Sequence, residues 1–154
     1  MSLLVKILIS ALACVLLGGL SGFVTVNAIQ TWYVTLNKPS WNPPSWLFGP
    51  VWTTLYIMMG IAFGLVWHSS NVDKKKAMIL FYIQFALNLL WSFLFFYFQS
   101  PGIALIEIVL MLALILLTTN AFKKIDARAA YLMIPYILWV SFATFLNFTI
   151  WRLN

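Results

Sequence analysis

Residues 31–46 read TWYVTLNKPSWNPPSW and separate two long apolar runs. The segment contains three tryptophans, three prolines and one lysine. Proline lacks an amide donor and fixes φ, so this stretch cannot continue a membrane helix, and it loses little entropy when it becomes ordered. Tryptophan often forms an interfacial belt, but a belt does not require prolines among the aromatic residues. The pattern favours an ordered connection that covers the end of a helical bundle.

The composition excludes a soluble globular domain. Of 154 residues, 64% are hydrophobic, 18% aromatic and only 8% charged, and the mean hydropathy is +0.99. A soluble domain carries about a quarter charged residues. Cys14 and His68 are the only cysteine and histidine, so the chain offers neither an internal disulfide nor a set of metal ligands. The chain is therefore expected to lie in a bilayer and to bind no metal.

Five apolar segments are long enough to cross a membrane, which requires about 20 residues per helix. They cover residues 3–29, 46–67, 77–98, 103–122 and 129–151. The first is too long for a typical secretory signal, so we expect it to be retained. The sequence predicts an all-α membrane protein with one five-helix transmembrane domain over residues 1–154. Residues 30–45 form its lid loop.

The basic residues predict the orientation. With five spans, the N-terminus and the second and fourth loops share one side of the membrane. That side holds Lys6, Lys74, Lys75, Lys76, Lys123, Lys124 and Arg128, whereas the other holds only Lys38 and Arg152. Cytoplasmic loops carry an excess of Lys and Arg. We therefore expect a cytoplasmic N-terminus and an external C-terminus, and the net charge of +6 does not indicate a nucleic-acid partner.

Three predicted helices carry an aromatic ring beside polar or small residues on one face. These stripes are Trp52, Tyr56 and Gly60; then Gln84, Asn88 and Trp91; then Trp139, Ala143 and Asn147. A side-chain amide in hydrocarbon is costly unless it is hydrogen-bonded, so Asn88 and Asn147 should face the interior. They could pair with each other or with backbone. They could also line a pocket for a flat apolar molecule, which needs stacking surface and a few orienting polar groups.

Two further features keep alternatives open. Gly60 and Gly64 form a small-xxx-small pair, which suits close packing within the bundle or a homodimer seam. Glu107 is the only acidic residue inside a predicted span. An intramembrane carboxylate is a candidate functional group, but Glu107 could also reach the surface or pair with Arg152.

Four stretches of the sequence resemble one known family. They are WYVTLNKPSWNPPSWLFGPVWTTLYIMMG at 32–60, ALNLLW at 86–91, IPYILW at 134–139 and FATFLNFTIWRLN at 142–154. Together they are similar to the translocator protein family, which includes the bacterial tryptophan-rich sensory proteins and the mitochondrial peripheral benzodiazepine receptor. The similarity covers nearly the whole chain and is weaker in the first and fourth helices.

The resemblance implies a five-helix bundle, commonly a homodimer, whose first loop forms a lid over a pocket. Family members bind porphyrins and benzodiazepine-site drugs, and several bacterial members promote light-dependent breakdown of protoporphyrin. The positions that match the pocket and lid motifs are Tyr33, Pro43, Trp52, Asn88, Trp139, Ala143 and Asn147. The helical stripes add Tyr56 and Trp91 to this set of candidate ligand-binding residues.

One position departs from the family's sterol-recognition pattern. The stretch LNFTIWR places Phe148 where the pattern has tyrosine. We therefore do not expect cholesterol binding, and the chain is interpreted as a bacterial-type member in a plasma membrane.

The functional hypothesis is a membrane protein that binds protoporphyrin or a related tetrapyrrole and requires no cofactor. The ring would stack between Trp52 and Trp139, and a propionate would meet Lys38 or Arg152. No conventional catalytic constellation is present, so any enzymatic activity would be photo-oxidation of the porphyrin through Trp52 and Trp139. The alternatives are a tetrapyrrole transporter, with Pro135 as a candidate hinge, and a non-catalytic scaffold or sensor.

Overall fold

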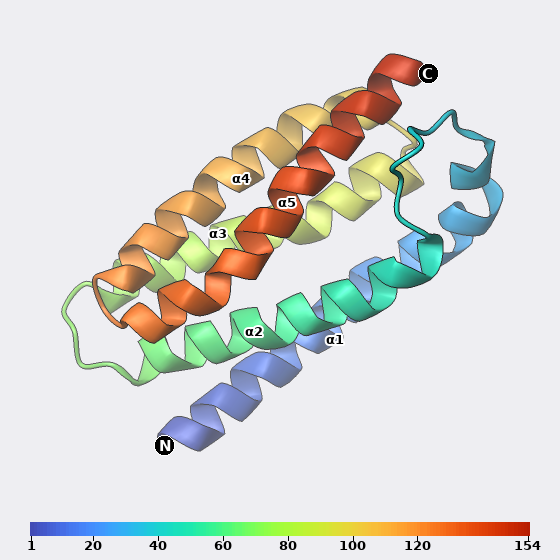
Figure 1. The fold of residues 1–154 in the computed structure, drawn as a ribbon. Helices are drawn as coiled ribbons and strands as arrows, with labels where there is room; N and C mark the ends of the chain where they lie inside the picture. Colours follow the sequence, from blue (N-terminus) through green and yellow to red (C-terminus); the bar gives the residue numbers. More distant parts are fainter.

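Five long helices form the whole architecture of the computed structural model, which describes residues 1–154 (Figure 1). They are α1 (Leu3–Thr31), α2 (Phe48–His68), α3 (Lys74–Ser92), α4 (Pro101–Lys123) and α5 (Ala127–Leu153). Two 3₁₀ turns, η1 (Tyr33–Thr35) and η2 (Ser45–Leu47), lie in the first loop, and a π turn, η3 (Phe93–Tyr97), extends α3. Each of the five spans is long and apolar enough to cross a membrane. The all-α, five-helix prediction is confirmed.

Several helices extend beyond the predicted apolar segments. The third begins at Lys74 rather than residue 77, and the fifth at Ala127 rather than residue 129. These first turns are polar or lie next to polar residues, so hydropathy alone excludes them. Asp126 caps α5 by accepting a hydrogen bond from the Arg128 amide at 2.9 Å. Hydrogen bonding from the Arg128 side chain holds the pKa of the Asp126 carboxyl below its usual value.

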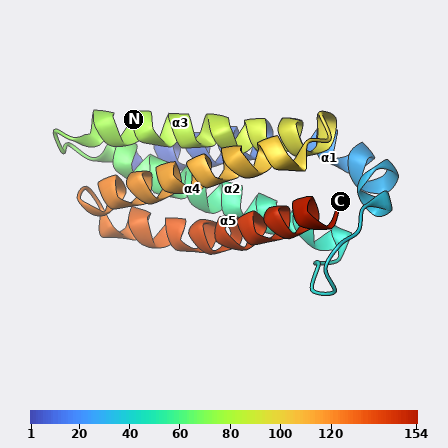
Figure 2. The ribbon, with the colours of Figure 1, turned by 90° about the horizontal axis from the view of Figure 1, so that it is seen from above.

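The helices lie side by side with α2 between α1 and α5, and with α4 between α3 and α5 (Figures 1 and 2). The contact between α1 and α3 closes the bundle. The N-terminus and the short connections after α2 and α4 lie at one end, and the first loop and the C-terminus lie at the other (Figure 1). The seven basic residues therefore gather opposite Lys38 and Arg152. Which end faces the cytoplasm stays a prediction.

At the end of the bundle that carries the N-terminus, α1 and α2 pack with their backbones in contact. A Cβ atom at Gly60 would collide with the backbone of Ala11, and one at Gly64 would collide with Ile7. Only glycine permits this approach, so the small-xxx-small pair is used within the bundle. The homodimer stays a prediction.

The π turn η3 shapes the opposite end of the bundle. The Phe93 amide bonds the Leu90 carbonyl, and the Ser21 hydroxyl on α1 donates to the Leu89 carbonyl at 3.2 Å. One wider turn brings Phe95 and Phe96 together into the interior, where both are buried. π turns often occur at functional sites. This one lies directly beneath the first loop.

Candidate ligand-binding cavity

A cavity of about 620 Å³ lies inside the bundle at the end covered by the first loop. It is lined by 29 residues, most of them hydrophobic, from all five helices and from the loop. Its size falls in the range of about 300–1,000 Å³ that suits drug-sized ligands. The aromatic side chains around it are Tyr33, Trp46, Phe48, Trp52, Tyr56, Trp91, Phe95, Phe96, Trp139 and Phe142.

Most of the predicted ligand-binding residues meet at this cavity. Those that line it are Tyr33, Trp52, Tyr56, Asn88, Trp91, Trp139, Ala143 and Asn147. Pro43, Lys38 and Arg152 do not line it. The helical spacing therefore brings the three predicted stripes onto one hollow, whereas the two cations at the same end of the bundle lie outside it.

The cavity floor is a chain of buried hydrogen bonds across three helices. The Tyr56 hydroxyl donates to Asn88 Oδ1 at 2.8 Å, and Asn88 Nδ2 donates to the Tyr136 hydroxyl at 2.9 Å. The Tyr136 hydroxyl in turn donates to Gln84 Oε1 at 2.8 Å. Asn88 therefore bonds tyrosines on α2 and α5 rather than Asn147 or backbone. These polar groups can lie in an apolar interior because the hydrogen bonds between them offset the cost of removing them from water.

Asn147 makes a second junction between helices. Its Oδ1 accepts a hydrogen bond from the Trp91 indole at 3.1 Å, and its Nδ2 donates to the Pro101 carbonyl at 2.8 Å. The Pro101 carbonyl lies in the first turn of α4, so this amide joins α3, α4 and α5 beside the cavity. Asn88 and Asn147 each keep one amide N–H that makes no hydrogen bond within the chain.

The two tryptophans expected to hold the ligand contact different aromatic neighbours. The ring centroid of Trp52 lies 5.6 Å from that of Tyr56 and 6.4 Å from that of Tyr136. Trp139 lies 6.2 Å from Phe48 and 5.5 Å from Phe142. The Trp139 indole nitrogen is buried and has no acceptor within the protein. A buried donor without a partner is costly, and a ligand acceptor would relieve that cost.

The first loop, which we call the lid, covers residues 32–47 rather than the predicted 30–45, because α1 continues to Thr31 and α2 begins at Phe48. It is held by its own polar groups. The Tyr33 hydroxyl donates to Asn42 Oδ1 at 2.8 Å, and burial raises the pKa of Tyr33 to about 12, although that hydrogen bond acts in the opposite direction. Lys38 Nζ donates to the carbonyls of Tyr33 at 2.7 Å and Leu36 at 3.0 Å. It also lies 4.9 Å from the centre of the Tyr33 ring. Lys38 therefore satisfies lid carbonyls, which the sequence did not reveal.

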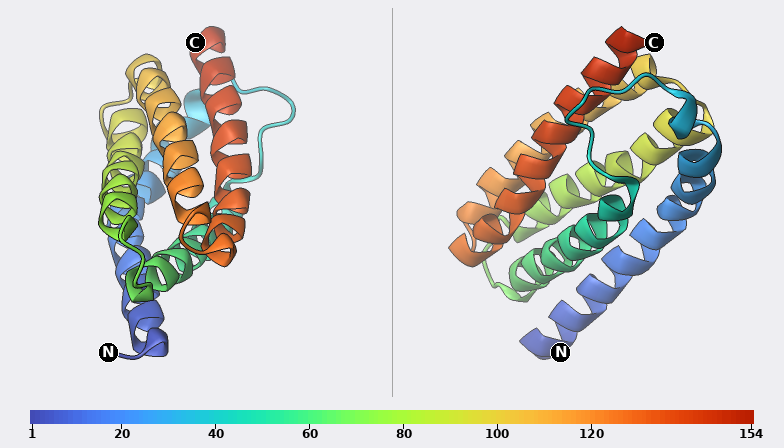
Figure 3. Two further views of the ribbon diagram at one scale, coloured as in Figure 1. Left: turned by 90° about the vertical axis from the view of Figure 1, so that its left-hand side faces the viewer. Right: turned by 45° about the vertical axis from the view of Figure 1, so that its right-hand side comes forward.

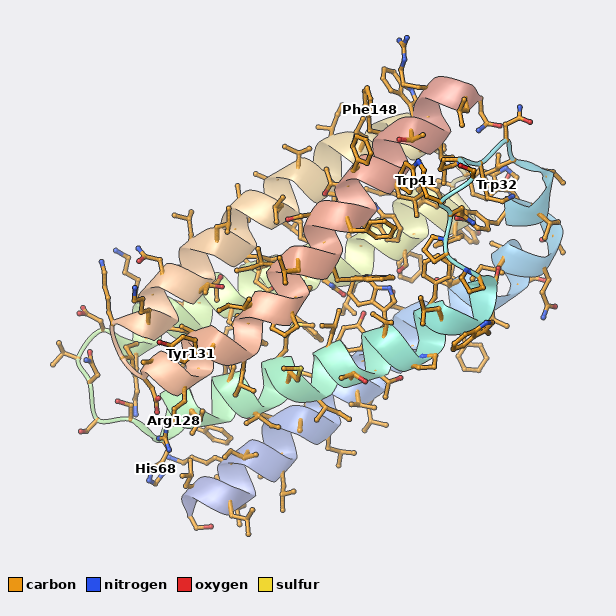
Figure 4. The ribbon with its side chains drawn as sticks, in the orientation of Figure 1. Trp32, Trp41, His68, Arg128, Tyr131 and Phe148 are labelled. Atoms are coloured by element: carbon orange, nitrogen blue, oxygen red, sulfur yellow. The ribbon has the colours of Figure 1, made fainter.

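The lid is also fastened to α5. Trp41 stacks on Phe145, with 5.3 Å between ring centroids and 15° between ring planes, and it contacts Phe142 edge-on. Figure 4 shows Trp41 between the loop and α5, and Trp32 on the side near the end of α1. Figure 3 shows the loop crossing from the end of α1 towards the C-terminal end of α5 and returning to α2. The lid thus spans the bundle's end.

Glu107 is buried in α4, and neither of its carboxylate oxygens has a hydrogen-bond partner. The only ion pair in the chain joins Asp126 to Arg128. Glu107 therefore neither reaches the surface nor pairs with Arg152, and both of those alternatives are wrong. It does not line the cavity.

These features define a class of protein: a multi-pass helical membrane protein with an aromatic cavity under an ordered loop. The pattern of the TspO/MBR family matches residues 10–152. The chain is 47% identical to the tryptophan-rich protein TspO of Chlorobaculum tepidum, over 92% of this chain and 90% of that protein. It is 41% identical to the human translocator protein, over 80% of this chain and 75% of that protein. The chain belongs to the TspO/MBR family.

The family covers bacteria, archaea and animals. The tryptophan-rich protein TspO of Archaeoglobus fulgidus is 37% identical over 98% of both chains. The resemblance found in the aromatic loop and in helices two, three and five is thereby confirmed. The particular membrane that holds this chain stays a prediction.

Proposed function

We propose that the protein binds protoporphyrin or a related tetrapyrrole in the cavity, and that drug-like benzodiazepine-site ligands occupy the same space. The observation that carries this proposal is the convergence of Trp52, Trp91 and Trp139 from three helices on one hollow of about 620 Å³. Flat aromatic walls favour a flat guest, because indoles offer large stacking surfaces.

The polar groups at the cavity favour a ligand that accepts hydrogen bonds. The Trp139 indole N–H has no partner, and Asn88 and Asn147 each keep one free amide hydrogen, whereas the oxygen of each amide already accepts one hydrogen bond. Tetrapyrroles carry acceptor nitrogens and propionates, and many drugs carry a carbonyl. A ligand with acceptors would therefore complete the unsatisfied donors.

The propionates of a bound porphyrin would lie at the lid end. Lys38 and Arg152 remain the candidate partners there, but Lys38 would have to release the carbonyls of Tyr33 and Leu36. Ion pairs near a surface add little free energy. We therefore assign most of the affinity to the aromatic contacts.

Titration with protoporphyrin IX tests the proposal, with the Soret band and tryptophan fluorescence as readouts. Ala143→Phe places a ring in the cavity, whereas Ala113→Phe adds the same ring to an exposed face of α4 that does not line it. We expect Ala143→Phe to weaken binding by about tenfold or more, since overpacking costs roughly 1–3 kcal/mol. The Ala113→Phe variant should bind normally. Equal affinities in both variants would contradict binding in the cavity.

Light-dependent oxidation of the bound porphyrin is a second proposed activity. Trp52 and Trp139 both line the cavity. An indole touching the excited ring can donate one electron to it, and the reduced ring passes that electron to dioxygen, which becomes superoxide. The indole radical cation then takes one electron from the porphyrin, so the porphyrin is oxidised by one electron overall and the tryptophan is restored. Bleaching of porphyrin absorbance under light should slow in the Trp52→Phe/Trp139→Phe variant relative to wild type. Equal bleaching at equal occupancy would leave a binding protein without this activity.

Transport of tetrapyrroles is the alternative function. Helix α5 runs without interruption from Ala127 to Leu153 through Pro135, so the candidate hinge residue lies within a continuous helix. Alternating access usually relies on broken helices near the bilayer centre. Uptake of protoporphyrin into proteoliposomes, compared with empty liposomes, distinguishes transport from capture. Capture without uptake also separates a binding protein from a scaffold that has no ligand.

A further inference from the structure

The wall of the cavity is open on one side only. Every exposed residue that lines the cavity belongs to α1 or to residues 45–53 at the start of α2. The lining residues of α3, η3, α4 and α5 are all buried or half-buried. The opening therefore lies between α1 and α2, and not through the rest of the bundle.

The space around the glycines shows where α1 and α2 are in close contact and where they separate. Near the N-terminus of α1 the helices touch, because a Cβ at Gly60 or Gly64 would collide with α1. Further along, Gly18 packs directly under the ring of Tyr56. Beyond this point a Cβ at Gly19 or Gly49 would meet no atom within 4 Å, although both residues line the cavity. The two helices thus part towards the lid and leave a slot.

The lid closes the other path to the cavity. On the side of α5 it is fixed by the hydrogen bonds between Asn37 and Asn154 and by the stack of Trp41 on Phe145. On the side of the slot, Trp46 is 71% exposed and lines the cavity. The fastened side and the open side of the lid therefore face different helices.

The slot lies within the membrane-spanning parts of both helices, Leu3–Thr31 and Ser45–His68. The exposed rim residues further from the lid are Gly19, Val26 and Thr53, and the Thr53 hydroxyl donates to the Gly49 carbonyl at 2.9 Å, whereas Gln30 and Ser45 lie nearer the lid. An occupant would therefore meet acyl chains at the deep end and polar surroundings at the lid end. This polarity suits an amphiphile that has one apolar edge and one edge that bears charge.

We propose that the cavity is filled sideways from the bilayer, through the slot between α1 and α2, by a flat amphiphile that passes edge-on with its charged edge towards the lid. The mechanism rests on the proposed binding of a porphyrin-like ligand. In this mechanism the protein takes up ligand that is dissolved in the membrane, and not ligand that is free in water. The lid stays fastened to α5 while the ligand enters and leaves.

The test measures rates as well as affinity, with the protein in phosphatidylcholine vesicles and protoporphyrin IX supplied from vesicles of the same composition. Gly19→Phe and Gly49→Phe each place a ring in the slot from opposite sides. Both association and dissociation should slow about tenfold, the equivalent of about 1.4 kcal/mol in each barrier. Ala113→Phe, on an exposed face of α4, should leave both rates unchanged.

The possible outcomes distinguish the entry route through the slot from the binding of porphyrin in the cavity. Unchanged rates in both slot variants, or weaker binding that arises only from faster dissociation, would overturn entry through the slot while leaving porphyrin binding intact. Faster association in Asn154→Ala, which frees the lid from α5, would also overturn it in favour of entry beneath the lid. Failure of the wild-type protein to bind protoporphyrin at all would instead remove the proposed function itself.

Discussion

Asn37 in the lid and Asn154 at the end of α5 bond each other reciprocally. The Asn37 amide donates to Asn154 Oδ1 at 3.0 Å, and Asn154 Nδ2 donates to the Asn37 carbonyl at 2.9 Å. The Asn154 side chain thus satisfies both the backbone N–H and the backbone carbonyl of Asn37, as a neighbouring β-strand would. Residues 117 positions apart in sequence hold the lid over the cavity.

Asn154→Ala should loosen the lid without unfolding the bundle. It removes the two hydrogen bonds from the Asn154 side chain to the lid, at an exposed position, so we expect a loss of about 1 kcal/mol, or roughly fivefold faster hydrogen exchange in residues 32–47. Exchange in the helix cores should not change. Uniformly faster exchange throughout the chain would show that the pair stabilises the whole fold instead of the lid.

Asn88→Leu should destabilise the bundle. The substitution leaves the Tyr56 hydroxyl without its acceptor and removes the donor to Tyr136. Hydrogen bonds between membrane helices contribute about 0.6–1.7 kcal/mol each, so we expect a loss of about 1–3 kcal/mol. Unfolding in mixed detergent micelles measures the effect. The exposed amide of Asn120 provides a control, and equal losses in Asn88→Leu and Asn120→Leu would contradict a role for the buried chain.

Gly60→Leu should force α1 away from α2. The new side chain would meet the backbone of Ala11, which cannot move as a flexible side chain does. We expect a loss of about 3 kcal/mol or more of stability, at the upper end of overpacking effects. Gly49→Leu, where there is open space, should cost much less. Thermal unfolding in detergent compares the two, and similar losses would show that helix propensity rather than close contact governs both sites.

Trp139→Phe should reduce protoporphyrin affinity more than Lys38→Met. The first change removes stacking area and the unpartnered indole N–H. The second removes a cation whose hydrogen bonds go to lid carbonyls, so its effect should fall on lid order. Fluorescence titration gives both affinities. A larger loss in Lys38→Met would mean that charge at the mouth, and not the aromatic wall, dominates binding.

The helices and the lining of the cavity follow largely from the sequence, for physical reasons. Long apolar runs must form helices in lipid, because no water satisfies their backbone groups. Spacing of three and four residues then places Trp139, Ala143 and Asn147 on one face. Polar or small residues on that face mark it as interior, and eight of the nine predicted ligand-binding residues line the cavity.

The hydrogen-bond partners could not be obtained in the same way. Tyr136 lies three residues before Trp139, so the helical spacing indicates that it lies on the inner face. Its hydrogen bonds to Asn88 and Gln84, however, depend on the crossing of α3 and α5. Lys38 carries a charge that fits a ligand or the lid equally well, and only the fold of the lid decides between them. The slot between α1 and α2 depends on helix divergence, which no local pattern records.

An experimental structure of the protein with protoporphyrin IX tests the central claim most directly. The account predicts a planar ring inside the cavity, in contact with Trp52 and Trp139, with the Trp139 indole nitrogen within hydrogen-bonding distance of a ligand acceptor. A porphyrin found only on the outer surface of the bundle, with the cavity filled by side chains or lipid, would contradict it.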